Sequence, residues 1–341
     1  MKKIGIIGHF GCGLQLTNGQ TVKTNMIFNT LAKEYKKDDV MQFDTHGGIK
    51  FMIKMPFVLI RALKRCQNII IMPAHKGICV ITPFLLFFNI FFNRPIHYVV
   101  IGGWLSDMLA SKKWLLYLVK KFKYIYIETE RLNLKLKELG LDNTIVMPNF
   151  KQIHPCNNIS FYQQPPYPIC TFSRVTKEKG IFEAISAIKK ANETLGENIY
   201  SLDIYGQIEN ETWFAEIMSN QPNYIQYKGC ISPNKSTETL NKYFALLFPT
   251  YYPGECFAGT IIDSFFAGLP VFASDWHDNP DIIRNMKTGI IFKSKSIDAI
   301  TESLLFAYKS PNIINQMRMN CIDEAMKYEP KGIIQILTSK L

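Results

Sequence analysis

The sequence has no closely spaced cysteine pairs, although it contains eight cysteines. None of them belongs to a CxxC motif, so neither a zinc framework nor a disulfide framework is expected. The N-terminus also lacks the apolar region of a signal peptide, because Gly8 and His9 interrupt the apolar run of MKKIGIIGHF after a few residues. We therefore expect a cytoplasmic protein whose thiols are reduced and mostly buried.

Long apolar runs are missing too. Residues 79–92 read CVITPFLLFFNIFF and are interrupted by Pro83 and Asn89, whereas a membrane-spanning helix needs about 20 apolar residues. We expect this stretch to form a buried core helix, with contact to a membrane surface as the alternative.

Acidic residues are scarce in the first half of the chain. Residues 1–150 contain 21 Lys and Arg against 9 Asp and Glu, whereas residues 151–341 contain 18 against 19. Nucleic acid is not the expected partner, because no zinc spacing, RNP-like aromatic motif or Arg-rich recognition helix accompanies the charge. Residues 49–65, IKFMIKMPFVLIRALKR, resemble a basic amphipathic helix of the membrane-surface kind. An anionic membrane surface or a lipid-phosphate acceptor fits the basic charge better than nucleic acid does. We therefore keep peripheral attachment at the inner face of the plasma membrane as a hypothesis.

The common nucleotide-binding motifs are absent as well. Gly8, Gly11 and Gly13 do not fit GxGxxG, and residues 19–24 do not fit a P-loop. A glycine-rich loop that opens a helix can still approach a diphosphate closely. Lys23, one turn into the predicted helix, either faces such a ligand or lies in solvent.

What the sequence does contain is room for about two domains, with apolar runs and amphipathic segments alternating as in doubly wound α/β domains. Residues 151–168, KQIHPCNNISFYQQPPYP, are polar, rich in proline and without periodicity, which predicts a linker between a domain at residues 1–150 and a second at residues 169–327. Strands are expected at residues 3–8, 39–43, 97–101, 124–129, 145–147, 169–172, 201–205, 224–229, 246–249, 270–274 and 288–292.

One segment, residues 251–274, combines a turn, a helix and two carboxylates. In YYPGECFAGTIIDSFFAGLPVFAS the proline and glycine cluster predicts a loop, and a helix follows from Ala258 to Gly268. The free N–H groups at such a helix start favour an anion at the carboxyl end of a parallel sheet. Glu255 precedes this helix and Asp263 lies inside it, so the two carboxylates flank the expected phosphate. The alternative is that Glu255 is an ordinary solvated loop residue and Asp263 an ordinary helix residue.

Two cations lie near the start of the predicted second domain. In SRVTKEKG, residues 173–180, Arg174 and Lys179 flank a turn that leads into a helix. Two cations on a loop at the carboxyl end of a strand suit a diphosphate, and an arginine can bind two of its oxygens at once. Alone the pair is a modest signal, because basic residues in turns are usually solvated.

Together these segments resemble the retaining nucleotide-sugar glycosyltransferases of the GT-B type, family 4, also called glycosyl transferases group 1. That family's signature is a Glu, seven residues, a second Glu and then GxPV. Here the signature runs from Glu255 to Asp263, with an Asp at the second position, and GLPV follows at residues 268–271. SRVTKEKG is similar to the family's GRLxxxKG element. The resemblance covers nearly the whole chain and is strongest over residues 172–292.

The resemblance implies two Rossmann-like domains that face each other across a cleft, with the C-terminal helix crossing back from about residue 328 to the first domain. It also implies transfer of a sugar, with retained anomeric configuration, from a nucleotide-diphosphate sugar to a glycan or polyprenyl-phosphate-linked acceptor in cell-surface polysaccharide biosynthesis. The acceptor would bind the first domain and the donor the second. No cofactor or metal is expected, since Asp275 and Asp278 are three positions apart and do not form the DxD of metal-dependent transferases.

The resemblance also assigns roles to residues. The departing diphosphate would be stabilised by Arg174 and Lys179, and the sugar hydroxyls held by Glu255. The expected donor-binding residues contact the phosphates, the ribose or the base, and they are Gly11, Gly13, Gly229, Cys230, Ala258, Gly259, Thr260, Ile261 and Asp263. The phosphate itself would accept the acceptor's proton, so no protein nucleophile is required.

Two departures from the family pattern keep other functions open. Asp263 is one methylene shorter than the family's Glu, and Gly102, Gly103 and Trp104 stand where many members carry a histidine. His75 or Asp107 could fill that gap. One alternative function is a nucleotide-sugar epimerase on the same fold, and another is a non-catalytic partner that binds a nucleotide sugar or a membrane.

Overall fold

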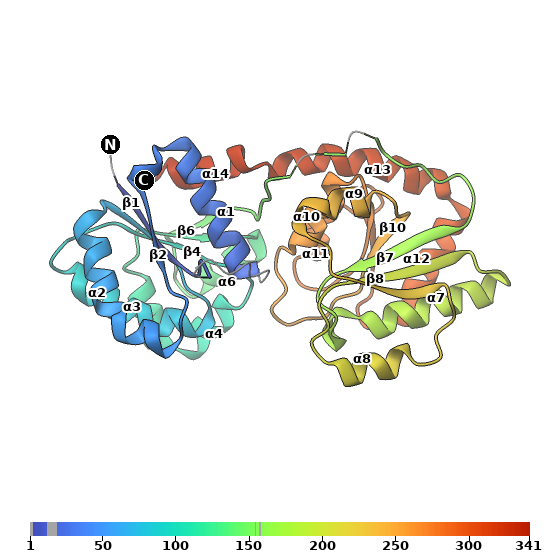
Figure 1. The fold of residues 1–341 in the computed structure, drawn as a ribbon, viewed down its shortest axis with the longest axis horizontal. Helices are drawn as coiled ribbons and strands as arrows, with labels where there is room; N and C mark the ends of the chain where they lie inside the picture. Colours follow the sequence, from blue (N-terminus) through green and yellow to red (C-terminus); the bar gives the residue numbers. More distant parts are fainter. Residues whose placement is uncertain (1–2, 12–18, 154, 157) are drawn as a thin grey trace. The chain divides into compact units, whose positions relative to one another are not determined.

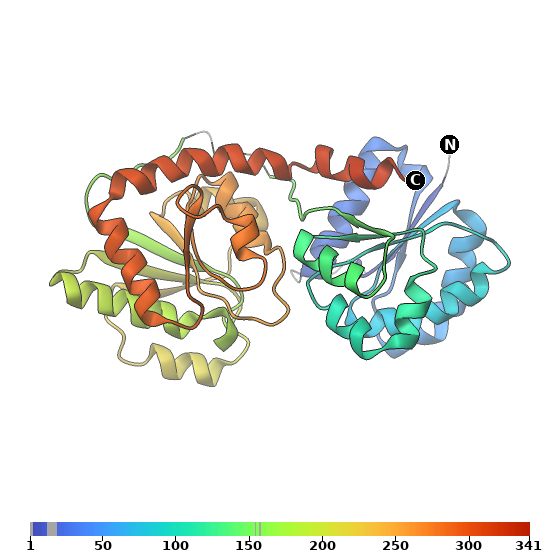
Figure 2. The same cartoon turned by 180° about the vertical axis from the view of Figure 1, so that it is seen from behind.

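A computed structural model describes residues 3–11, 19–153, 155–156 and 158–341 (Figures 1 and 2). The chain divides into two units, the first made of residues 1–149 and 330–341 and the second of residues 150–329. Each unit contains a six-stranded sheet whose strand pairs are all parallel. The predicted α/β fold with two Rossmann-like domains is confirmed.

The first sheet has the order β2-β1-β3-β4-β5-β6. Its strands are β1 (Ile4–Gly8), β2 (Val40–Asp44), β3 (Asn68–Met72), β4 (Ile96–Val99), β5 (Tyr124–Ile127) and β6 (Thr144–Val146). Its helices are α1 (Gly19–Glu34), α2 (Ile49–Arg65), α3 (His75–Asn89), α4 (Leu105–Ser111), α5 (Lys113–Val119), α6 (Glu130–Glu138) and α14 (Pro330–Thr338).

Helices cover both faces of this sheet. A single buried core joins α2, α3, α5 and α6 on one face, while α1 and α14 contact each other on the opposite face (Figure 1). The helices lie on two faces because the crossovers between parallel strands are right-handed. Along the sheet the chain moves in one direction from β1 to β2 and in the opposite direction from β2 to β3, so the connecting helices α1 and α2 lie on opposite faces. The C-terminal helix therefore returns to the first unit, as predicted, and the Asn68 side-chain amide donates a 3.2 Å hydrogen bond to the Leu341 carbonyl.

The strands of the first unit are mainly apolar and buried. Every residue of β1 and β3 is buried, as expected for parallel strands that are covered on both faces. β3 was missing from the predicted strands. The predicted strands otherwise coincide with observed ones to within two residues at each end.

The second sheet has the order β12-β11-β10-β7-β8-β9. Its strands are β7 (Tyr167–Phe172), β8 (Tyr200–Tyr205), β9 (Ile225–Gly229), β10 (Ala245–Phe248), β11 (Val271–Ser274) and β12 (Gly289–Phe292). Its helices are α7 (Ile181–Leu195), α8 (Glu211–Met218), α9 (Ser236–Leu240), α10 (Gly259–Phe266), α11 (Asn279–Ile282), α12 (Ile297–Lys309) and α13 (Pro311–Ala325).

The order of the second sheet creates a switch point between β7 and β10. From β7 the chain proceeds through β8 to β9 on one side, and then returns to place β10 on the other side of β7. The connections that follow β7 and β10 therefore leave toward opposite faces. Ligands of open α/β sheets bind at the carboxyl ends of strands at such a point.

Candidate functional site

The connections after β7 and β10 meet closely at Gly180. This residue ends a short 3-10 turn (Lys177–Lys179) and begins α7 with a φ of 73°. A Cβ atom there would lie 2.3 Å from the carbonyl oxygen of Pro249, just beyond β10. A glycine is therefore required for both the left-handed backbone and the close approach.

This approach brings Lys179 and Glu255 together. Lys179 donates a short hydrogen bond to Oε2 of Glu255, and both side chains are only 9% exposed. The Thr250 hydroxyl donates to the same oxygen over 2.8 Å. Within the described part of the chain Oε1 of Glu255 has no hydrogen-bond partner, so it can accept from a ligand hydroxyl.

Tyr252 connects this pair with Arg174. The guanidinium carbon of Arg174 lies 5.2 Å, and the Lys179 ammonium 5.1 Å, from the centroid of the same Tyr252 ring. Arg174 is half-exposed and forms an ion pair with Glu209. Two cations thus converge on one aromatic side chain at the switch point, and one of them remains open to solvent.

The first turn of α10 lies just after Glu255 in the chain. Its N-cap residue, Ala258, has no side-chain acceptor for the first N–H groups of the helix. Among the described residues no partner is found for the N–H groups of Gly259 and Thr260, while Ile261 donates to Ala258 over 3.1 Å. The Thr260 hydroxyl oxygen is also buried and finds no hydrogen-bond partner in the described part of the chain. Unsatisfied donors at a helix start suit an anion.

Asp263 is engaged more fully than the sequence suggests. It is buried, Ser236 donates to its Oδ1 over 3.2 Å, and Lys151 forms an ion pair with its Oδ2. Burial raises the pKa of the Asp263 carboxyl, and Lys151 and Ser236 oppose that shift. Both carboxylate oxygens therefore already accept hydrogen bonds from the protein.

The remaining predicted donor residues lie at or just after the ends of β9 and β1. Gly229 ends the edge strand β9 with a φ of 77° and accepts from the Gly206 N–H over 2.9 Å, and Cys230 beside it is exposed. Gly11 follows β1 in the first unit with a φ of 86°. Gly13 lies outside the described residues. Their contact with a donor stays a prediction.

Lys23 was predicted either to face a ligand or to lie in solvent, and it does not lie in solvent. It is 3% exposed and forms a buried ion pair with Glu128, just beyond β5. The pairing joins positions 105 residues apart, so no local spacing indicates it.

Sequence reasoning also missed two histidines at the carboxyl edge of the first sheet. His9 contacts the Thr21 hydroxyl over 2.7 Å and the His46 ring nitrogen over 2.9 Å. Burial and the neighbouring His46 lower the pKa of His9. His75, considered earlier for the family's histidine position, has its ring centroid 5.1 Å from that of Trp104.

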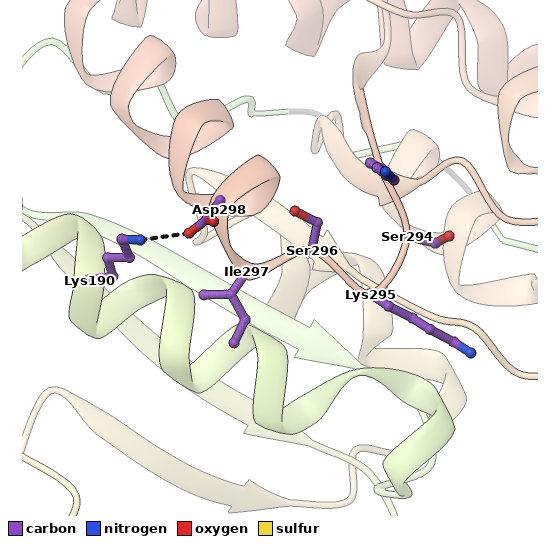
Figure 3. Close-up of a pocket in the computed structure, with 7 residues that line it drawn as sticks. Lys190, Ser294, Lys295, Ser296, Ile297 and Asp298 are labelled. Carbon is purple, nitrogen blue, oxygen red and sulfur yellow. Dashed lines mark hydrogen bonds and ion pairs between the residues drawn. The ribbon is translucent and has the colours of Figure 1, made fainter.

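A separate pocket lies at the start of α12 (Figure 3). Lys190 of α7 forms a 2.6 Å ion pair with Asp298 there, and none of the predicted site residues lines it. Across the residues that the structure describes, no group of three or more His, Cys, Asp or Glu side chains is placed to hold a metal ion.

Comparisons with known proteins show which proteins the second unit resembles. A family model described as "Glycosyl transferases group 1" matches residues 159–328. The GtfA subunit of the UDP-N-acetylglucosamine–peptide N-acetylglucosaminyltransferase of Streptococcus pneumoniae is 28% identical over 196 residues, which are 55% of this chain and 37% of that protein.

Solved structures agree in fold. The pneumococcal O-GlcNAc transferase GtfA, in complex with UDP and GlcNAc, matches with a TM-score of 0.68 at 19% identity, over 84% of this chain and 59% of that one. HepE of Anabaena, in complex with UDP-glucose, matches with a TM-score of 0.74 at 12% identity, over 100% and 98% of the two chains. Sucrose-phosphate synthase of Thermosynechococcus elongatus matches with a TM-score of 0.76 at 13% identity, over 99% and 98%. The fold is that of the GT-B glycosyltransferases, and residues 159–328 of this chain match the model of the glycosyl transferases group 1 family.

Proposed function

We propose that this protein is a retaining glycosyltransferase that moves a sugar from a nucleotide-diphosphate sugar to a glycan or lipid-linked acceptor in cell-surface polysaccharide biosynthesis. The observation that carries the proposal is the meeting of Lys179, Glu255 and Arg174 around Tyr252 at the switch point of the second sheet. The second unit would bind the donor, and the first the acceptor.

The charges at this site suit the cleavage of a glycosyl phosphate. Breaking that bond leaves negative charge on the diphosphate and positive charge on the sugar. Arg174, Lys179 and the free N–H groups of α10 supply the matching positive potential, and each such contact contributes about 3 kcal/mol. We expect these groups to suffice without a metal.

Glu255 suits the binding of sugar hydroxyls better than attack on the sugar. Its Oε2 already accepts from Lys179 and Thr250, which stabilises the carboxylate and makes it a weaker nucleophile. Its Oε1 can accept from a hydroxyl of the donor sugar. The departing phosphate would then take the acceptor's proton on the same face, which retains the anomeric configuration.

The base of the donor is proposed from the relatives. GtfA and HepE were solved with UDP or UDP-glucose, so uridine diphosphate sugars are the first donors to test. Since this chain covers 37% of the length of the pneumococcal GtfA subunit, the acceptor and linkage of that enzyme are not transferred to it.

The test is nucleotide release. The purified chain is incubated with a panel of nucleotide sugars, with and without a lipid acceptor extract, and free nucleoside diphosphate is measured. Release should depend on acceptor and fall by about 100-fold in Glu255→Ala and Arg174→Ala. Lys190→Ala, which removes an exposed ion pair elsewhere in the second unit, should behave like the wild type. Epimerised donor without release, or binding without turnover, would refute transfer.

A further inference from the structure

Three helices on one face of the first sheet leave large apolar side chains in solvent. α3 contacts both α2 and α5, so the three helices form one continuous layer (Figures 1 and 2). In the described residues no helix is long and apolar enough to cross a membrane. We call the exposed side chains of α2, α3 with its following turn, and α5 the outer surface of this layer.

α2 divides into a buried and an exposed side. Met55, Leu59 and Leu63 lie in the core, whereas Ile53 is 73% and Phe57 is 77% exposed. Such exposure is unusual for these residue types when they share one helix face, because burying each would contribute about 1.5–3 kcal/mol. The exposed side of α2 is therefore a candidate for contact with another apolar phase.

The neighbouring helices extend the same surface with aromatic residues. Ile90 and Phe91, just after α3, are 74% and 75% exposed, and Phe91 contacts the half-exposed Phe87 with a ring distance of 6.4 Å. On α5, Trp114 is 49% and Tyr117 is 64% exposed. Tryptophan and tyrosine favour the boundary between lipid headgroups and acyl chains. The expected core helix at residues 79–92 thus buries only one of its sides.

The charge around these apolar side chains has one sign. Residues 45–127 contain twelve Lys and Arg but a single acidic residue, Asp107. On α2 the residues Lys54, Arg61 and Lys64 are exposed beside Ile53 and Phe57. Basic residues next to exposed apolar residues complement phosphate headgroups above acyl chains.

We propose that the outer surface of α2, α3 and α5 docks on an anionic lipid bilayer, with Ile53, Phe57, Ile90 and Phe91 entering the headgroup region and the basic side chains contacting lipid phosphates. This inference goes beyond sugar transfer and does not depend on it. A protein partner on the same surface would have to supply both a large apolar patch and many carboxylates.

The test is vesicle binding by the full-length chain, without donor or acceptor. Vesicles of phosphatidylcholine with about 30% phosphatidylglycerol are compared with pure phosphatidylcholine in a flotation assay. The wild type should bind only the anionic vesicles, and high salt should release it. Lys54→Glu/Arg61→Glu/Lys64→Glu should weaken binding by at least about 100-fold, since each basic residue near the surface contributes about fivefold. Ile53→Ser/Phe57→Ser should weaken it by at least about tenfold.

Two matched variants of the second unit are the controls. Lys235→Glu/Lys287→Glu/Lys309→Glu reverses three exposed charges, and Phe182→Ser removes an apolar side chain that is 50% exposed on α7. Both should bind like the wild type. All variants change exposed side chains, so their melting temperatures should match the wild type. The proposal is overturned if the wild type ignores anionic vesicles, if the first-unit variants bind as well as the controls, or if the surface captures a protein instead.

Discussion

Replacing Gly180 by alanine tests whether the connections after β7 and β10 are held together as the structure shows. Gly180 has a φ of 73°, and its added Cβ would lie 2.3 Å from the Pro249 carbonyl oxygen. The left-handed backbone costs an L-residue about 1–2 kcal/mol. Relief of the contact requires movement of the Pro249 backbone, which adds about 1–3 kcal/mol. Gly180→Ala should therefore lower the free energy of unfolding by about 2–5 kcal/mol.

Gly196 provides a control with the same backbone angle. Its φ is 74°, but among the described residues no heavy atom other than those of its chain neighbours lies within 4 Å of an added Cβ. Gly196→Ala should therefore cost only the conformational part, about 1–2 kcal/mol. Urea denaturation followed by circular dichroism measures both variants. Nucleotide release should fall further in Gly180→Ala, since that change displaces Lys179 from Glu255. Equal losses of stability in the two variants would refute the reasoning.

Three further predictions concern ionisable side chains that are paired or buried. In urea denaturation, Lys179→Met and Glu255→Gln should each lower the free energy of unfolding by about 3 kcal/mol. The double variant should lower it by clearly less than the sum of the two single losses, because the residues are paired. Strictly additive losses would mean that they are not paired. Burial lowers the pKa of His97 to about 4, so the folded state keeps it neutral while the unfolded state binds a proton below about pH 6.5. The free energy of unfolding should therefore fall by about 2 kcal/mol as the pH is lowered from about 7.5 to 5. If a His97→Gln variant shows the same decrease, His97 is not its cause. Lys151→Met should lower the free energy of unfolding by about 3 kcal/mol, because it leaves the buried Asp263 carboxylate without its cation. The loss should be smaller in an Asp263→Asn background. Equal losses in both backgrounds would contradict the pairing.

The fold was predictable where the sequence is locally consistent. Unbroken apolar runs such as residues 4–7 are typical of strands covered on both faces, and turn residues separate them from the helices. Asn68–Met72 was missed although it is as apolar as the others. It lies between two long helices that contain many apolar residues, α2 and α3, so a short strand does not stand out by hydrophobicity.

The candidate site was predictable only where its charged residues lie close to a recognisable turn or helix start in the sequence. Arg174 and Lys179 share one turn, and Glu255 directly precedes a helix. The partners of these groups are fixed by the tertiary fold. Lys151 meets Asp263 from 112 positions away, and Glu209, which follows β8, meets Arg174 from 35 positions away. No spacing rule relates such residues, so sequence reasoning named one member of each pair and missed the other.

The most direct test of the account is calorimetric titration of uridine diphosphate into the wild type, Arg174→Ala and Lys190→Ala. Both substitutions remove a solvent-exposed cation from an ion pair within the second unit. Arg174→Ala should weaken binding by at least about tenfold, because a hydrogen bond to a charged group contributes about 1.5–3 kcal/mol. Lys190→Ala should bind like the wild type. A wild-type chain that binds no uridine diphosphate, or two variants that bind it equally well, would contradict the placement of the donor diphosphate beside Arg174, Lys179 and the start of α10.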